Sequence, residues 1–299
     1  MGAMRGFRFG CNVRTIRSRE ALTDLCRDAE RRGYDAVLVP DHLGRNRPSP
    51  FPVMVAIADA TDRLRVGPFV LNVGFWNPSL LARDVATTDH LTGGRLELGL
   101  GAGHMKSEFD AAGIPWQTFS ERVDRLAATL DELDRLFSDE QAGYDVAQRP
   151  RPPLMIAGTG RRTLDLAAER ADIVGFTGIL QARGKPPGSF RIATADEMDE
   201  RVAGFRARAN ARAGEIEANV LVQRVVVTDD RRTAAVRFLD EYGPGLTVDE
   251  VLEAPCLLFG TVREISEQVV ERRERFGFSY ICVHEPDIQR FGPVIEALR

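Results

Sequence analysis

Three of the four histidines directly follow runs of apolar residues that predict strands, and they are His42, His104 and His284. An imidazole titrates closer to physiological pH than any other side chain, so His42 and His104 are candidates for proton transfer or for a hydrogen bond to a cofactor. For His42 the alternative is a loop residue that organises Asp41. For His284 the alternative is a buried residue bonded to the backbone.

Residues 157–163, Ala-Gly-Thr-Gly-Arg-Arg-Thr, place glycines at the turn between a predicted strand and a predicted helix. Free N–H groups at the helix start, the hydroxyls of Thr159 and Thr163 and the adjacent arginines suit a phosphate. The spacing lacks the lysine of a Walker loop, and a tight turn with a capping threonine is the alternative. The candidate ligands of a phosphate-bearing cofactor are Ala157, Gly158, Thr159 and Gly160.

The run from Gly99 to His104, Gly-Leu-Gly-Ala-Gly-His, matches part of the dinucleotide-binding fingerprint. That fingerprint needs glycine or alanine where His104 stands, so the match is weak evidence. Because glycine lacks a Cβ, we interpret the run as clearance for a flat ring or a neighbouring backbone. This interpretation makes Gly101, Ala102 and Gly103 candidate cofactor contacts.

Two aromatic residues, Phe75 and Trp76, follow the predicted strand over residues 65–73. Trp76 is a candidate for the apolar wall of a pocket for a flat ring, whereas packing under the neighbouring loop is an equal alternative for Phe75. Together with His284, Trp76 is the candidate for contact with a substrate.

Neither metal nor disulfide chemistry is indicated. The sequence has no His-x-His motif, and its strand-end carboxylates are too few for a metal cage. The four cysteines are far apart and include no Cys-x-x-Cys motif. We therefore expect no metal centre and set a metallohydrolase aside.

The candidate residues lie at the ends of eight strand-like runs that alternate with helical runs. In such an arrangement the carboxyl ends of the strands carry the active site. We expect a (β/α)8 TIM barrel forming one domain over residues 1–299, with insertions, notably after the sixth strand, where the irregular stretch 180–195 is a candidate lid. The strand-like runs are 7–13, 34–40, 65–73, 95–103, 153–157, 172–176, 219–228 and 279–284, and the helical runs are 19–32, 53–61, 79–91, 119–137, 161–170, 196–213, 231–242, 262–276 and 286–298.

The formal net charge of -4 argues against nucleic acid or an anionic membrane as a partner, and leaves a small molecule as the expected one. No apolar stretch approaches the roughly 18 residues of a membrane-spanning helix. Residues 1–4 lead directly into a strand without a signal peptide, so we expect a cytoplasmic location.

Four motifs are Asp41-His42, Leu71-Asn72-Val73, residues 91–103 and residues 156–160. Together they resemble the bacterial luciferase-like superfamily, and more narrowly its coenzyme F420-dependent oxidoreductases. The Gly-Gly-Arg-Leu-x-Leu-Gly-x-Gly pattern inside residues 91–103 is the most specific of the four. The resemblance extends from residue 7 to about residue 178.

This resemblance implies that F420 lies at the barrel mouth with its phosphate on Gly158–Gly160. It also implies that Asp41 and His42 lie near the reactive edge of the ring, and that a cis peptide between Asn72 and Val73 supports its middle. A homodimer is implied as well.

Two positions depart from the sugar-phosphate dehydrogenases of that family. His104 stands where those enzymes have a carboxylate, and Asn46 where they have a tryptophan. A phosphosugar substrate is therefore not expected. The function expected from the resemblance is hydride transfer between F420 and a small organic substrate, with a proton from His42 or His104. An FMN-dependent monooxygenase of the same superfamily and a non-catalytic F420-binding protein are the alternatives.

Overall fold

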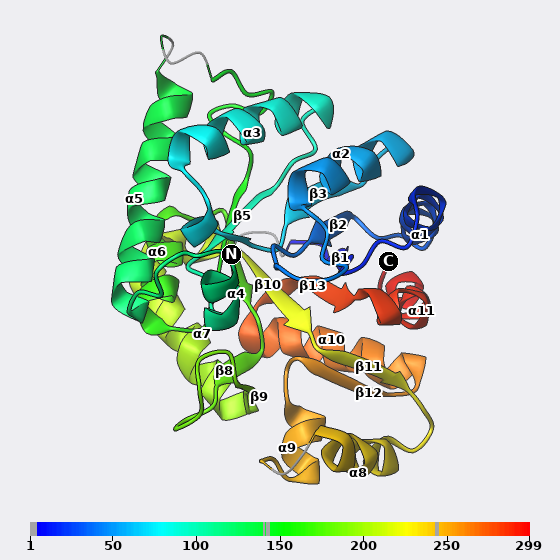
Figure 1. Cartoon of the computed structure of the whole chain (residues 1–299). Coiled ribbons are helices and arrows are strands. Elements are labelled where there is room, and N and C mark those ends of the chain that lie inside the picture. Colours follow the sequence, from blue (N-terminus) through cyan, green and yellow to red (C-terminus); the bar gives the residue numbers. More distant parts are fainter. Residues whose placement is uncertain (1–4, 140, 142–143, 243–244) are drawn as a thin grey trace.

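The computed structural model describes residues 5–139, 141, 144–242 and 245–299, and it confirms the predicted barrel (Figure 1). Its main sheet has nine strands in the order β3-β2-β1-β13-β10-β7-β6-β5-β4, and each described pair is parallel. The strands are β1 (Arg8–Asn12), β2 (Ala36–Val39), β3 (Arg65–Pro68), β4 (Leu71–Asn72), β5 (Leu98–Gly101), β6 (Leu154–Ala157), β7 (Ile173–Phe176), β10 (Glu217–Val222) and β13 (Phe278–His284).

The two edges of this sheet meet because β3 and β4 are parts of one interrupted strand. Val66 in β3 forms a parallel bridge with Leu96, shortly before β5, which lies at the other edge beside β4. The barrel therefore has eight strand positions, as predicted.

Eight helices surround the strands, and Figure 1 shows them as a ring. They are α1 (Arg19–Arg31), α2 (Pro50–Ala60), α3 (Pro78–Leu91), α5 (Phe119–Ser138), α6 (Arg161–Arg170), α7 (Ala195–Ala209), α10 (Val262–Phe276) and α11 (Ile288–Leu298). Capping boxes fix the starts of three of these helices. In each box the threonine side chain accepts a hydrogen bond from the backbone N–H of a glutamate, and the glutamate carboxylate accepts one from the backbone N–H of the threonine. These pairs are Thr118 with Glu121, Thr194 with Glu197, and Thr261 with Glu264.

The end of the barrel at which the strands begin is closed by ion pairs. Glu97 accepts hydrogen bonds from Arg8 and from Nε of Arg65, the latter at 2.7 Å. Arg8 also donates to Glu217 at 2.5 Å, and both glutamates are buried. Since this end is filled, the opposite end, called the mouth below, is the one open to ligands.

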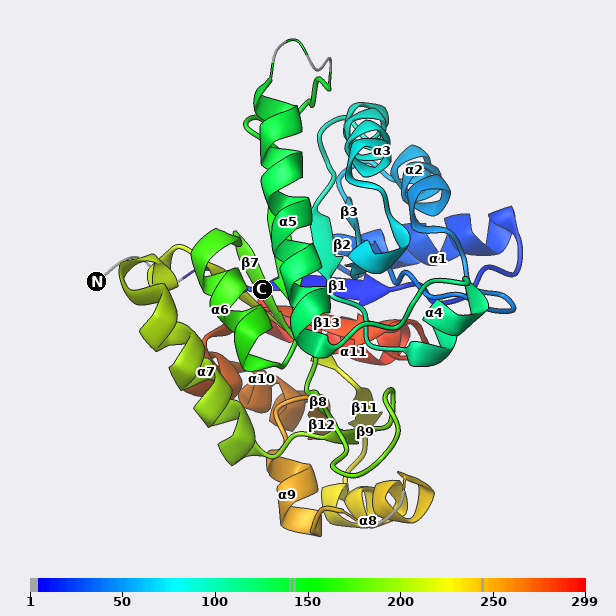
Figure 2. The same ribbon diagram turned by 60° about the vertical axis from the view of Figure 1, so that its left-hand side comes forward.

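The stretch 180–195, predicted as an irregular loop, contains an antiparallel hairpin of β8 (Ile179–Gln181) and β9 (Phe190–Ile192). Figure 2 shows this hairpin at one side of the barrel, near α4 (Lys106–Ala111), a short helix that the sequence did not predict. A glutamine side chain bridges the hairpin, since Gln181 donates to the backbone of Pro186 and accepts from Gly188.

The single strand predicted over 219–228 is wrong, because the chain forms two strands there. After β10 the chain leaves the barrel as β11 (Arg224–Val227), which pairs with β12 (Leu257–Gly260) in a separate parallel sheet. This pair carries α8 (Arg231–Tyr242) and α9 (Val248–Glu253) around its own apolar cluster. The chain between α8 and α10 thus holds the short helix α9 and the unpredicted strand β12, and residues 243 and 244 lie outside the described residues.

No helix in the described part of the chain is long and apolar enough to span a membrane. All four cysteines are buried and free, and burial raises the pKa of each thiol.

Candidate active site

A pair of hydrogen-bonded side chains from different elements forms the centre of the mouth. Nδ1 of His42, just after β2, lies 2.8 Å from Oε1 of Glu108 on α4. The side chains are 28% and 14% exposed, so the contact is partly shielded from water. Because a carboxylate only accepts hydrogen bonds, the contact assigns a proton to Nδ1 and leaves Nε2 for another partner.

His104 joins this pair edge-on. Its ring centroid lies 5.6 Å from that of His42 at an interplanar angle of 86°, and 5.2 Å from that of Phe190 in the hairpin. The pKa of His104 is lowered, with burial of the ring as the first cause and the charge of the neighbouring His42 as the second, although part of the residue is still exposed to solvent. His104 therefore favours the neutral form and is a weaker base than an ordinary histidine. The two candidate histidines from the sequence are thus brought together.

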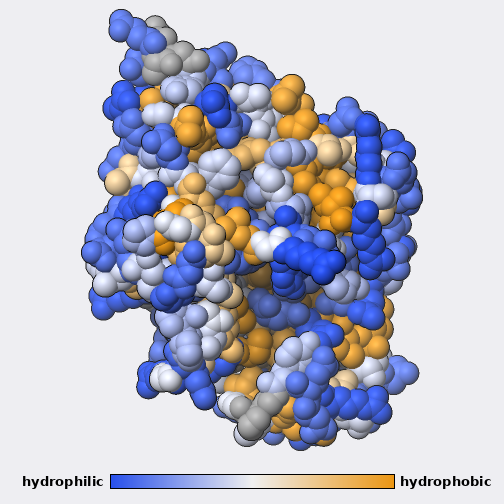
Figure 3. All heavy atoms as spheres, viewed as in Figure 1, coloured by the Kyte–Doolittle hydropathy of each residue, from blue (hydrophilic) through white to orange (hydrophobic). Residues whose placement is uncertain are grey.

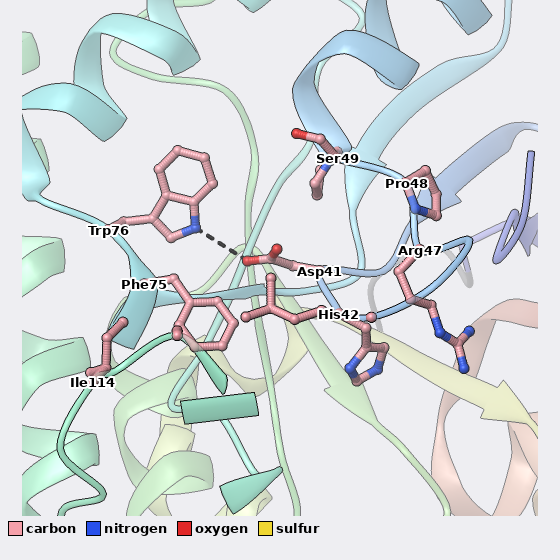
Figure 4. Close-up of a pocket in the computed structure, with 12 residues that line it drawn as sticks. Asp41, His42, Arg47, Pro48, Ser49, Phe75, Trp76 and Ile114 are labelled. Carbon is pink, nitrogen blue, oxygen red and sulfur yellow. Dashed lines mark hydrogen bonds between the residues drawn. The ribbon is translucent and has the colours of Figure 1, made fainter. Parts of the chain in front are cut away.

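Asp41 connects the end of β2 to β4 and to the segment that follows it. Its Oδ2 accepts hydrogen bonds from the backbone N–H of Asn72 and from Nε1 of Trp76, both at 3.1 Å. Figure 4 shows the indole pointing toward this carboxylate. Burial raises the pKa of Asp41, and the two donated hydrogen bonds oppose that rise. Asp41 therefore orients Trp76, the candidate substrate contact.

Trp76 lines a cavity of about 430 Å³ beside His42, between the loop that follows β2 and the segment 112–114 (Figure 4). Phe75 lines the same cavity and also packs on Phe109 of α4, with the ring centroids 5.3 Å apart, so both of its alternatives are observed. Phe51 supports Trp76 from behind, with the ring centroids 5.2 Å apart. The cavity has apolar walls and the polar groups of Asp41 and His42 at its edge, an arrangement typical of small-molecule sites.

The cis peptide expected between Asn72 and Val73 is wrong in position, since the structure has it between Phe69 and Val70. The irregular segment lies between β3 and β4, where Val70 packs against two glycines. A Cβ added to Gly101 would lie 2.6 Å from Cγ2 of Val70, and one added to Gly99 would lie 2.2 Å from the carbonyl oxygen of Pro68.

These two glycines therefore make room for the interrupted strand, which corrects the interpretation that they clear space for a flat ring. The approaching group is backbone at Gly99, as in the alternative stated for the run, and the side chain of Val70 at Gly101. Gly101 and Ala102 are buried, and Gly103, at φ 74°, packs on the side chain of Asn72. Asn72 also accepts from Gly74 N–H, and Val73 is 1% exposed in the core.

The predicted phosphate turn lies across the mouth, between β6 and α6. Gly160 is the N-cap of α6, and no side chain caps its first turn. Phe119 packs on Gly160 and Thr163 on Gly158, because an added Cβ would lie 2.5 Å and 2.7 Å from those side chains. Ala157 is buried, whereas Thr159 is partly exposed. The uncapped amides fit an anionic group such as a phosphate.

His284 lies at the end of β13 with partners on both ring nitrogens. Nδ1 lies 2.9 Å from Oδ1 of Asn12, and Nε2 lies 3.2 Å from Oε1 of Gln223. Gln223 in turn donates to the carbonyl of Thr177 at 2.7 Å, which fixes its amide orientation. Burial and then the charge of Arg14 lower the pKa of His284 to about 4, so the ring is neutral and has one N–H. That proton lies on Nε2 and is donated to Gln223, and Nδ1 accepts from the amide of Asn12 with its oxygen and nitrogen exchanged.

Sequence reasoning missed Glu108, Gln223 and Arg122 as residues of the mouth. Arg122 on α5 donates to the carbonyl of Gly103 at 3.3 Å and stacks on Trp116, 3.8 Å from the ring centroid. Glu108 was visible as a carboxylate close to His104 in sequence, but only α4 turns it toward His42. The described residues contain no group of three or more side chains that could hold a metal ion.

Comparison with known proteins matches this geometry to enzymes of one family. The profile of the luciferase-like monooxygenase family matches residues 1–243. An F420-dependent glucose-6-phosphate dehydrogenase of Segniliparus rotundus is 34% identical over 125 residues, which cover 39% of this chain and 37% of the relative. An FMNH(2)-dependent dimethylsulfone monooxygenase of Pseudomonas putida is 28% identical over 167 residues, which cover 50% of this chain and 46% of the relative.

The solved structures extend the likeness of fold over the whole chain. An F420-dependent secondary alcohol dehydrogenase in complex with an F420-acetone adduct superimposes with a TM-score of 0.74 and 19% identity, over 99% of this chain and 100% of that chain. The profile match covers more than half of the 299 residues. The chain therefore belongs to the luciferase-like monooxygenase family.

Proposed function

We propose that the protein is an F420-dependent oxidoreductase that transfers a hydride between the deazaflavin and a small organic substrate. The observation that carries the proposal is the contact between His42 and Glu108, beside His104 and at the edge of the cavity that Trp76 lines. The F420-dependent relatives support the choice of cofactor, and the aligned segments span about half of their length or less.

The residues at the mouth fit such a cofactor. The uncapped start of α6 and the turn Gly158–Gly160 would hold its phosphate-bearing tail. Asp41, His42 and Gly103 would lie around its ring, with Asn72 and Val73 beneath the surface and Gly101 and Ala102 in the buried strand behind. When bound, F420 supplies or accepts the hydride.

Within this arrangement the protein has to deliver or remove one proton. Glu108 orients His42 so that Nε2 is the atom available for the exchange. His104, with its lowered pKa, is a neutral neighbour of His42 and contacts Phe190 edge-on. Of the two histidines predicted as catalytic, the geometry favours His42 as the proton carrier. Trp76 and His284 would contact the substrate from either side of the mouth.

The second candidate is a reaction with reduced FMN, as in the monooxygenase relative. An uncapped helix start binds the phosphate of either cofactor, so the phosphate turn does not discriminate between them. We also propose that the protein acts as a single domain and a homodimer in the cytoplasm.

The test is turnover of F420 by the wild type and by His42→Ala. Reduced F420 is mixed with a panel of ketones, aldehydes and activated alkenes, and oxidised F420 with alcohols, while F420 absorbance is followed. We expect at least one compound to be turned over, and His42→Ala to lower kcat by about 10²-fold or more while the Kd for F420 changes less than threefold. Equal losses in kcat and affinity would reject the proton-transfer role, and tight F420 binding without any turnover would reject the enzyme.

A further inference from the structure

Strongly hydrophilic side chains cover much of the surface in Figure 3, where water solvates their charges. Arg122 on α5 is instead buried, with 8% of its surface exposed. Its guanidinium donates to two backbone carbonyl oxygens and, among the described residues, to no carboxylate. Burying a charge costs free energy that these contacts have to offset.

One of the two hydrogen bonds holds the peptide that leads into His104. Nε of Arg122 donates at 3.3 Å to the carbonyl oxygen of Gly103, which belongs to the peptide bond between Gly103 and His104. Gly103, at φ 74°, also packs on the side chain of Asn72, since an added Cβ would lie 2.4 Å from Oδ1 of that residue. The backbone before His104 is therefore held from two sides, and its imidazole lies 5.6 Å from that of His42 between ring centroids.

The face of the same guanidinium supports the helix that carries Glu108. It stacks on Trp116, 3.8 Å from the ring centroid, and Nη1 donates to the carbonyl of Gln117 at 2.5 Å. Trp116 packs edge-on against Phe109 with the ring centroids 5.0 Å apart, and these two rings are called the aromatic stack below. Phe109 follows Glu108 on α4, so the stack ends next to the carboxylate that contacts His42.

A planar cation suits both contacts at once. The N–H groups of a guanidinium donate in its plane, while its face stacks on an aromatic ring. A lysine ammonium keeps the charge but lacks the plane, and a glutamine amide keeps a plane but lacks the charge. These two replacements therefore separate the geometric contribution of Arg122 from the contribution of its charge.

The charge of Arg122 also acts on His104. Burial is the first cause that lowers the pKa of His104, the charge of His42 is the second, and the charge of Arg122 acts in the same direction. Glu108 opposes them. The charged or titratable groups that face the ring are thus His42 after β2, Glu108 on α4 and Arg122 on α5.

We propose that Arg122 is a positioning residue that sets the placement of His104 relative to the hydrogen-bonded pair around His42. It acts through the Gly103 peptide and through the aromatic stack, and not on the reacting atoms. This inference rests on the proposed function for its effect on turnover, whereas the placement of His104 is measured without cofactor or substrate.

The experiment compares the wild type with Arg122→Gln and Arg122→Lys by kcat and by an NMR titration of the His104 ring. The chain has four histidines, so the loss of one resonance in His104→Gln identifies that ring. We expect Arg122→Gln to raise the pKa of His104 and to lower kcat on the order of tenfold, because the proton-transfer groups are misplaced, while the Kd for F420 changes by less than about threefold. Arg122→Lys should keep the pKa of His104 close to that of the wild type, because the charge remains, and should recover only part of kcat, because the planar contacts are lost.

The matched control is Arg135→Gln, which removes an exposed arginine near the other end of α5, where it pairs with Glu132. Its kcat and its His104 titration should both match those of the wild type. A loss of kcat in this control as large as that in Arg122→Gln, or an unchanged kcat in Arg122→Gln, would overturn the positioning role. An equal rise in the pKa of His104 in Arg122→Gln and Arg122→Lys would overturn it as well, because the rise would then come from a loosened site and not from the charge.

Trp116→Leu serves as a second variant if Arg122→Gln does not fold. It removes the ring under the guanidinium and should lower kcat in the same direction, and a wild-type kcat in this variant would overturn the role. If the wild type turns over no F420, the proposed function is wrong, and the titration of His104 in the free Arg122 variants still decides whether Arg122 places His104.

Discussion

Oε1 of Glu108 lies 2.8 Å from Nδ1 of His42, and this contact joins α4 to the end of β2. Of the two, His42 follows the barrel strand β2, and Glu108 belongs to a six-residue helix outside the barrel. The contact makes the orientation of the imidazole depend on where α4 is held. Phe109, fully buried on that helix, packs against Phe75 and Trp116 and holds it in place.

Replacing Glu108 tests whether it positions His42. Glu108→Ala should lower kcat with any accepted substrate by about 10-fold to 10²-fold, because His42 loses the acceptor that fixes its proton on Nδ1. Glu108→Gln keeps an acceptor oxygen and should recover most of that loss with a changed pH profile. The Kd for F420 should change less than threefold in both variants.

The matched control is Asp110→Asn on the same helix, whose carboxylate pairs with Lys106 at the surface. A loss of kcat in this control as large as that in Glu108→Ala would mean that both substitutions act by displacing α4 and not through the contact with His42. An unchanged pH profile in Glu108→Gln would reject the positioning role.

The sequence predicted the barrel because its eight strand positions are short apolar runs separated by helical periodicity. It also placed His42 and His104 at the active-site end of the barrel, since both follow strands that end at the same side of a parallel sheet. It did not predict the partner Glu108, because α4 is a short helix whose orientation is set by the packing of Phe109 rather than by local sequence.

The glycines of β5 show a second limit of the sequence. A glycine run indicates close approach, but it does not identify the approaching group. Here the groups are Val70 and the backbone of Pro68 from the interrupted strand, so the residues that the run accommodates come from another segment of the chain. The expected cis peptide at Asn72–Val73 was taken from the family resemblance, and the structure has it at Phe69–Val70.

A double-mutant cycle tests this packing. Gly101→Ala should lower the free energy of unfolding by about 1–3 kcal/mol, because the new Cβ meets Cγ2 of Val70. Val70→Ala should restore about 1 kcal/mol or more in the Gly101→Ala background. Urea unfolding of the four proteins gives the coupling.

The contrast is Gly99→Ala, whose Cβ would meet the carbonyl oxygen of Pro68. Truncation of the Val70 side chain does not move that oxygen atom. Val70→Ala should therefore restore little of the free energy of unfolding that Gly99→Ala loses. Rescue of both glycine variants to the same extent, or of neither, would contradict this account of the run.

The neutral state of His284 predicts a dependence of stability on pH. The folded pKa of about 4 lies below the ordinary value near 6.5, so between these values the unfolded chain binds more protons. The part of the folding stability that comes from the neutral ring of His284 is fully present above pH 6.5 and is lost as the pH falls toward 4. The wild type should therefore lose up to about 3 kcal/mol more than His284→Gln over this range.

Urea unfolding at several pH values measures this difference, with His90→Gln, which removes an exposed histidine, as the control. The difference in stability between the wild type and His284→Gln should narrow as the pH falls, and that for His90→Gln should stay nearly constant. A constant difference for both variants would mean that His284 is not held neutral in the folded protein.

The central claim is that the mouth of this barrel binds a deazaflavin. Its most direct measurement is a fluorescence titration of the purified protein with F420 and, separately, with FMN under the same conditions. The account predicts saturable binding of F420 with a Kd at least tenfold below that of FMN. Binding of FMN with no detectable binding of F420 would contradict it.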